Sequence, residues 1–272
     1  MKSLFFLSLL FCLFLISCVS TEKQVKKAEL HHQLALSLMK KCQYPAALTE
    51  LRKAIELKSK EPLFYHSIAL LYFQFKKYEK TIQYLKKALR LNPDFTSARI
   101  HLGRSLVEVN KWQKGMAELK KAKEDLTYRY PENIHTHLGV AFYKRKKYFE
   151  AEKHFHVARA VKGEDCHTAL YHAKSLYFLG QFQKALTILE PSKKWCEKNF
   201  SSCSSPSVDS YFFAALAYDK TDQRQKALLN LKVFLNKAQD SAYKEEAKKY
   251  QKLWNLTLSP SPAKRGGKLK KI

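Results

Sequence analysis

Apolar residues recur along this chain with the spacing of amphipathic helices, and one short pattern returns at nearly regular intervals. Ala54, Ala88 and Ala122 are spaced by 34 residues, and Ala158 follows after 36. Similar sequences surround the four alanines: LTELRKAIEL, IQYLKKALRL, MAELKKAKED and EKHFHVARAV. Leu, Ala, Lys, Glu and Gln are abundant, and all of them favour helices. The pattern therefore predicts an all-α protein made of repeated helical units.

The 34-residue period, with small residues at fixed places, resembles the tetratricopeptide repeat (TPR). The second unit matches best, with Tyr65, Ala69, Leu85, Ala88 and Pro93 in the places where this family has them. Two short stretches, 130–131 and 200–207, fall between units. The resemblance implies six repeats within a domain of residues 28–241, at 28–61, 62–95, 96–129, 132–165, 166–199 and 208–241.

In this family each repeat is a helix (A), a short turn and an antiparallel helix (B), with positions counted from the repeat's first residue. Small residues at positions 8 and 20 let the two helices approach closely, and neighbouring repeats stack into a right-handed superhelix. Residues 242–258 show helical apolar spacing and are predicted to form a capping helix. Residues 259–272 contain Pro, Gly and basic residues with almost nothing apolar, which is typical of a disordered tail.

The first residues have the pattern of an export signal. Lys2 precedes an uncharged apolar run that is too short for a comfortable membrane span but suits a signal peptide. The run ends in Leu15-Ile16-Ser17-Cys18, which resembles the bacterial lipobox. The resemblance implies removal of residues 1–17, lipid attachment at Cys18 and a linker over residues 18–27, and Val19 favours the outer membrane. The alternative is an ordinary secretory signal or a short anchor.

The chain has six cysteines, of which Cys12 leaves with the signal and Cys18 would carry lipid. An exported chain meets an oxidising compartment in which disulfides persist. Cys196 and Cys203 bracket a short Ser-containing stretch, so we expect a disulfide between them, with two free thiols in a loop as the alternative. Cys42 and Cys166 resemble isolated core or turn residues.

No recognisable catalytic constellation is present. The chain lacks the phosphate-loop, dinucleotide, zinc-protease and nucleophile-elbow motifs. Its ten histidines include no pair four residues apart, and pairs such as His135/His137 diverge around a helix. The sequence therefore predicts neither an enzyme nor a metal, cofactor or small-molecule site.

The formal net charge is +26. A solvated basic exterior explains it most simply, and attraction to anionic lipid, acidic envelope polymers or an acidic partner is the functional alternative. Such a charge would suit nucleic acid, but the export signal argues against that partner.

TPR proteins bind partners along positions 2, 5, 9 and 12 of helix A, which we call the helix-A stripe. Much of this stripe is apolar here, which favours binding of an amphipathic helix or extended segment of another protein. The alternative is that some of these side chains pack inside the array. The candidate groove residues are Leu63, His66, Leu70, Phe73, Ile100, Arg104, Val107, Val140, Tyr143, Leu170, Tyr177 and Phe212.

A lipobox, a short linker and six TPR units together resemble the pilotin lipoproteins of type IV pilus systems. That resemblance implies a non-enzymatic lipoprotein of the outer membrane, facing the periplasm, that binds the secretin and promotes its assembly. Two alternatives are a scaffold for peptidoglycan enzymes or other envelope complexes, and an attachment factor at the cell surface.

Overall fold

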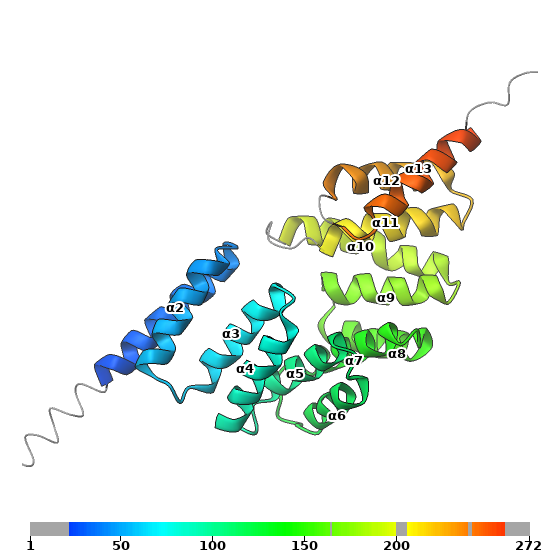
Figure 1. Ribbon diagram of the computed structural model, residues 1–272. Coiled ribbons are helices and arrows are strands. Elements are labelled where there is room, and N and C mark those ends of the chain that lie inside the picture. Colours follow the sequence, from blue (N-terminus) through cyan, green and yellow to red (C-terminus); the bar gives the residue numbers. More distant parts are fainter. Residues whose placement is uncertain (1–21, 164, 200–205, 239–240, 259–272) are drawn as a thin grey trace, which may run out of the picture. The chain divides into compact units, whose positions relative to one another are not determined.

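The computed structural model describes residues 22–163, 165–199, 206–238 and 241–258, and these residues form thirteen helices and no strand (Figure 1). The expected all-α fold is confirmed. The first helix covers residues 22–40. The others are α2 (Tyr44–Leu57), α3 (Pro62–Gln74), α4 (Tyr78–Leu91), α5 (Thr96–Glu108), α6 (Trp112–Lys123), α7 (Pro131–Lys144), α8 (Tyr148–Lys162), α9 (Cys166–Phe178), α10 (Phe182–Asn199), α11 (Pro206–Asp219), α12 (Arg224–Lys237) and α13 (Lys244–Leu258).

The chain divides into two compact units, one ending at Ala141 and the other beginning at Phe142. We call their described residues the N-terminal unit and the C-terminal unit. Within each unit, consecutive helices pair and then stack on the next pair, as α3 with α4 and α9 with α10 (Figure 1). One pair cannot bury its apolar face alone, so stacking supplies the core.

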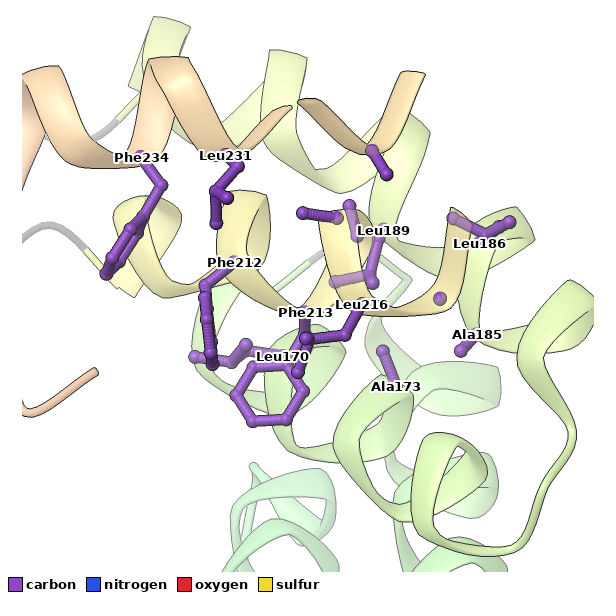
Figure 2. Close-up of a cluster of buried hydrophobic side chains, with 14 of the residues drawn as sticks. Leu170, Ala173, Ala185, Leu186, Leu189, Phe212, Phe213, Leu216, Leu231 and Phe234 are labelled. Carbon is purple, nitrogen blue, oxygen red and sulfur yellow. The ribbon is translucent and has the colours of Figure 1, made fainter. Parts of the chain in front are cut away.

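The core of the C-terminal unit lies where α9, α10, α11 and α12 converge, with Ala247 and Trp254 of α13 added to it (Figure 2). Aromatic rings fill its centre, with Phe212 and Phe234 at 5.3 Å between ring centroids. Phe234 stands at position 27, where the family has alanine, and its ring is fully buried. The side chains that meet there come from α9 (Leu170, Ala173), α10 (Ala185, Leu186, Leu189), α11 (Phe212, Phe213, Leu216) and α12 (Leu231, Phe234).

Small buried residues mark the places where helix A and helix B touch. In the third repeat these are Gly103 and Gly115, at positions 8 and 20. A Cβ added to Gly115 would lie 2.7 Å from the Gly103 carbonyl oxygen, and one added to Gly103 would lie 2.7 Å from Leu119 Cγ. The second repeat has Thr81 at position 20, and its hydroxyl donates to the Lys77 carbonyl at 3.1 Å. A polar atom at this crowded contact is therefore satisfied locally.

A left-handed residue recurs at position 15, in the turn between helices A and B. Its φ is 56° at Lys76, 60° at Asn110, 57° at Lys146 and 57° at Asp222, all outside the range that most side chains prefer. Gly180 has φ 73° at the same position of the fifth repeat, and Cys42 has φ 62° in the first. Glycine adopts this backbone conformation without a steric penalty, so only the fifth repeat has the residue that its turn favours.

The expected disulfide between Cys196 and Cys203 is wrong in its pairing, because Cys196 is bonded to Cys166. These two residues are 30 apart in sequence, but α9 and α10 are antiparallel. The far end of α10 therefore returns beside the start of α9, with a Cα–Cα distance of 5.8 Å. Cys42 is disulfide-bonded as well, so neither Cys42 nor Cys166 is an isolated thiol. Cys18, Cys203, the signal and the tail lie outside the described residues.

We predict that Gly115→Ala destabilises the protein by about 1–2 kcal/mol, although alanine favours helices. Overpacking costs about 1–3 kcal/mol, and the gain in helix propensity recovers up to about 1 kcal/mol. Urea unfolding of the variant measures the difference. Lys114→Ala, on the exposed side of the same helix, should leave stability nearly unchanged. Equal stability of Gly115→Ala and the native chain would contradict the close contact.

We predict that Lys76→Gly stabilises the protein by about 0.5–1 kcal/mol. The change relieves a left-handed residue, which costs about 1–2 kcal/mol, and part of the gain is lost to the freer unfolded glycine. The reverse change, Gly180→Lys, should destabilise by about 1 kcal/mol. Urea unfolding midpoints of both variants test the turn, and shifts of the same sign would count against it.

Candidate functional site

The helix-A stripe is far less exposed than its composition suggested. Six of the twelve candidate residues are buried, five are half-buried, and only Leu63 is exposed, with 41% of its surface accessible. The helices that carry the stripe pack against their neighbours, so these side chains serve the interior as well. The buried six are His66, Ile100, Val107, Val140, Leu170 and Phe212; the half-buried five are Leu70, Phe73, Arg104, Tyr143 and Tyr177.

The one exposed candidate of the stripe lies in the N-terminal unit, among half-buried neighbours. Leu63 is exposed at position 2 of the second repeat, and Leu70 and Phe73 are half-buried at positions 9 and 12. The first repeat adds Leu36, which is 37% exposed, and the half-buried Met39. Sequence analysis missed these last two, although counting positions 9 and 12 in the first repeat finds them. The five side chains form what we call the open stripe.

A cation lies at the border of the open stripe. The Arg104 guanidinium carbon stands 4.2 Å from the centre of the Phe73 ring. Phe73 also meets Tyr78 edge-on, at 5.3 Å between centroids. Arg104 and Phe73 are half-buried and keep solvent access.

Behind this border lies a row of histidines. His66 Nε2 is 3.1 Å from His101 Nδ1, and the His101 and His137 rings are 5.8 Å apart. His101 Nδ1 donates to the Ser97 carbonyl at 2.8 Å. Burial, together with the neighbouring His101 and His32, lowers the pKa of His66 to about 3. Burial lowers the pKa of His101 to about 4, with the Ser97 carbonyl opposing and Arg104 assisting. Both imidazoles are therefore neutral near pH 7.

Part of the stripe of the C-terminal unit is covered by the chain itself. Tyr243, just before α13, reaches back to the fifth repeat, where its hydroxyl accepts a hydrogen bond from Lys174 Nζ at 2.8 Å. Its ring stacks on Phe212 at 5.1 Å. Lys174 is only 5% exposed, and burial lowers its pKa to about 8. Phe212, predicted as a groove residue, therefore packs against Tyr243 of the same chain.

The described residues include no group of three or more His, Cys, Asp or Glu side chains that could hold a metal ion. A search of the same residues for a helix long and apolar enough to cross a membrane finds none.

Comparison with known proteins places this geometry in the TPR class. Residues 40–122 match the family model described as anaphase-promoting complex, cyclosome, subunit 3. This match and the solved structures together identify the fold as a TPR array, a class of protein-interaction module. The match covers less than half of the chain, so it defines the type of repeat and not the role of the protein. No curated protein sequence matches the chain.

Two solved structures align with this chain over nearly their whole length. PilW, described as a widely conserved type IV pilus biogenesis factor, is 19% identical, with a TM-score of 0.66 over 81% of this chain and 98% of its own. PilF from Pseudomonas aeruginosa is 16% identical, with a TM-score of 0.65 over 84% and 99%. The Cut9–Hcn1 complex of the anaphase-promoting complex has a TM-score of 0.70 at 15% identity, over 88% of this chain and 45% of its own.

We predict that acid destabilises the protein through the buried histidines. A histidine whose folded pKa lies below its unfolded value of about 6.5 adds no penalty above that pH. Below that pH, and down to the folded pKa, only the unfolded state takes up the proton. Each such histidine therefore lowers the free energy of unfolding by about 1.4 kcal/mol per pH unit in this range. His66 and His101 should each remove about 2 kcal/mol between pH 7.5 and pH 5.

Urea unfolding at the two pH values measures this loss. His66→Gln should flatten the pH dependence, whatever its effect on absolute stability. The control His156→Gln alters a histidine that is exposed on α8 and should leave the dependence unchanged. Equal pH dependence in both variants would disprove the role of the buried row.

Proposed function

We propose that this protein is a lipid-anchored TPR lipoprotein of the bacterial outer membrane. It faces the periplasm and acts as a pilotin, binding the type IV pilus secretin and promoting its assembly. The open stripe of the N-terminal unit holds the partner, and no chemical step is catalysed.

The observation that carries this proposal is the near-complete structural match to PilW and PilF. Almost the whole length of both structures is covered, so this chain has a comparable number of repeats as well as the same fold. PilW is itself described as a type IV pilus biogenesis factor. At 16–19% identity the match concerns the fold, and the role in pilus assembly is our proposal.

Two features of the chain support export and anchoring. The apolar run that ends in Leu15-Ile16-Ser17-Cys18 fits a lipoprotein signal. The Cys166–Cys196 disulfide fits an oxidising compartment, since reducing cytoplasm keeps such pairs open. Attachment at Cys18 would place the first described helix, which begins at residue 22, close to the membrane surface.

The open stripe supports protein binding. Leu36 and Leu63 are exposed leucines at equivalent faces of neighbouring repeats, with half-buried Leu70 and Phe73 beside them. Apolar side chains spaced in this way fit the anchors of an amphipathic helix or an extended segment. A scaffold for peptidoglycan enzymes would use the same face, and an attachment factor would instead present it outside the cell.

We predict that Leu63→Ser combined with Phe73→Ser lowers recovery of the partner at least tenfold. The experiment is crosslinking in the native host, purification of the tagged lipoprotein and mass spectrometry of the crosslinked proteins. The matched control is Phe149→Ser, which removes an exposed phenylalanine from α8 outside the stripe and should retain the partner. Circular dichroism checks that each variant keeps its helices.

The pilotin role is supported if secretin is the main crosslinked protein and if its recovery is lost in the Leu63→Ser, Phe73→Ser variant. Deletion of the lipoprotein should then also deplete secretin multimers, and Cys18→Ser should release the protein from the membrane fraction. Peptidoglycan enzymes in place of secretin would overturn the pilotin role. Cleavage by protease added to intact cells would overturn the periplasmic orientation.

A further inference from the structure

The molecule contains the same cation–aromatic arrangement twice, two repeats apart. Lys174 occupies position 9 of the fifth repeat and lies 5.2 Å from the ring of Tyr143, at position 12 of the fourth. Arg104 occupies position 9 of the third repeat and lies 4.2 Å from Phe73, at position 12 of the second. The repeat geometry thus places a cation on the ring of the preceding repeat in both units.

The same repeat positions also carry rings near the two cations in the sequence of repeats. Position 6 supplies Tyr171 and Phe213 beside Lys174, with Nζ at 4.9 and 4.8 Å from the ring centres. In the N-terminal unit, position 6 supplies His101 and His137, whose rings lie 5.8 Å apart. We call the two sets the N-terminal socket (Phe73, His101, Arg104, His137) and the C-terminal socket (Tyr143, Tyr171, Lys174, Phe213).

The C-terminal socket holds a ligand, which is the chain's own Tyr243. The tyrosine hydroxyl accepts from Lys174 at 2.8 Å, and its ring meets Phe213 edge-on at 5.3 Å. Ser241, two residues before, donates to Asp209 at 2.8 Å. Three contacts therefore hold this segment in place: the Tyr243 ring packs among aromatic rings, its hydroxyl bonds to Lys174, and Ser241 bonds to Asp209.

The lysine is an unusual choice for position 9. The same position holds Leu36, Leu70, Val140 and Leu216 in other repeats, and an apolar side chain serves packing at less cost than a buried ammonium group. A cation is worth retaining there when it meets rings and a hydroxyl oxygen together. Tyr243 supplies both, so it shows which side chain this arrangement binds.

We propose that the N-terminal socket binds a tyrosine side chain of the partner protein, with the ring beside Phe73 and the hydroxyl accepting a hydrogen bond from Arg104. This inference rests on the proposed binding of a partner along the open stripe, and it names the side chain that the partner presents. Arg104 and Phe73 keep solvent access, whereas Lys174 beneath Tyr243 has almost none. Leu63 and Leu70 of the open stripe provide an apolar surface for the residues that flank the tyrosine.

The probe is a synthetic peptide with the chain's own sequence Asp-Ser-Ala-Tyr-Lys-Glu-Glu-Ala, which surrounds Tyr243, titrated into the full chain by calorimetry. We expect one peptide per native chain, with a Kd below about 1 mM. The same peptide with Ala in place of Tyr has equal charge and should not bind. The peptide with Phe should bind about tenfold more weakly, because the hydrogen bond to a charged donor is lost.

Variants of the cation then locate the site. Arg104→Met should weaken binding at least tenfold, while Arg104→Lys, which reproduces the cation of the C-terminal socket, should retain it. Lys86→Met removes an equal charge from an exposed position and should change nothing. Tyr243→Ala should empty the second socket and raise the stoichiometry to two peptides per chain.

A native chain that takes up no peptide, or an Arg104→Met chain that binds it undiminished, overturns the tyrosine assignment. That failure is distinct from failure of the proposed function. If crosslinking still recovers secretin through Leu63 and Phe73, the partner-binding role stands and only the chemistry of its ligand is wrong.

Discussion

The close contact between helix A and helix B is the constraint on which the rest of the molecule depends. At Gly103 and Gly115 the backbones approach so closely that either Cβ would fall within 3 Å of the opposing helix. This contact fixes the angle within one repeat, and stacking transmits that angle to the next. Because the repeats within each unit share this geometry, side chains at equal positions meet similar neighbours. The two sockets, two repeats apart, are a direct consequence.

The same regularity limits what the helix-A stripe can offer. Neighbouring A helices pack together, so apolar residues such as Ile100 and Val140 are used in the interior. Among the described residues, Leu36 and Leu63 remain accessible. In the C-terminal unit the covering element is Tyr243 with the start of α13. The surface that a TPR array can offer to a partner is thus made of the side chains that neither repeat packing nor other parts of the same chain cover.

Sequence reasoning succeeded wherever the decisive contact is local. The small residues at positions 8 and 20 and the short turn between the two helices follow from counting, because each lies within one helical hairpin. It failed where partners are distant in sequence: Cys166 and Cys196 are separated by 30 residues, and Lys174 and Tyr243 by 69. Burial of much of the stripe was predicted only as the alternative, since the family pattern gives positions but not how tightly neighbouring A helices pack.

Lysines lie at both edges of the N-terminal unit. The turns between helices A and B in the first two repeats carry Lys40, Lys41, Lys76 and Lys77, all exposed. The connections between repeats and the helix ends that lead into them carry Lys60, Lys120, Lys121 and Lys123 as well as Asp94 and Asp125. The net charge of +26 is therefore spread over both edges, and a basic surface of this kind attracts acidic segments over about 10 Å at moderate salt. Long-range attraction of this kind raises association rates, whereas apolar contacts along the open stripe determine how long a partner stays.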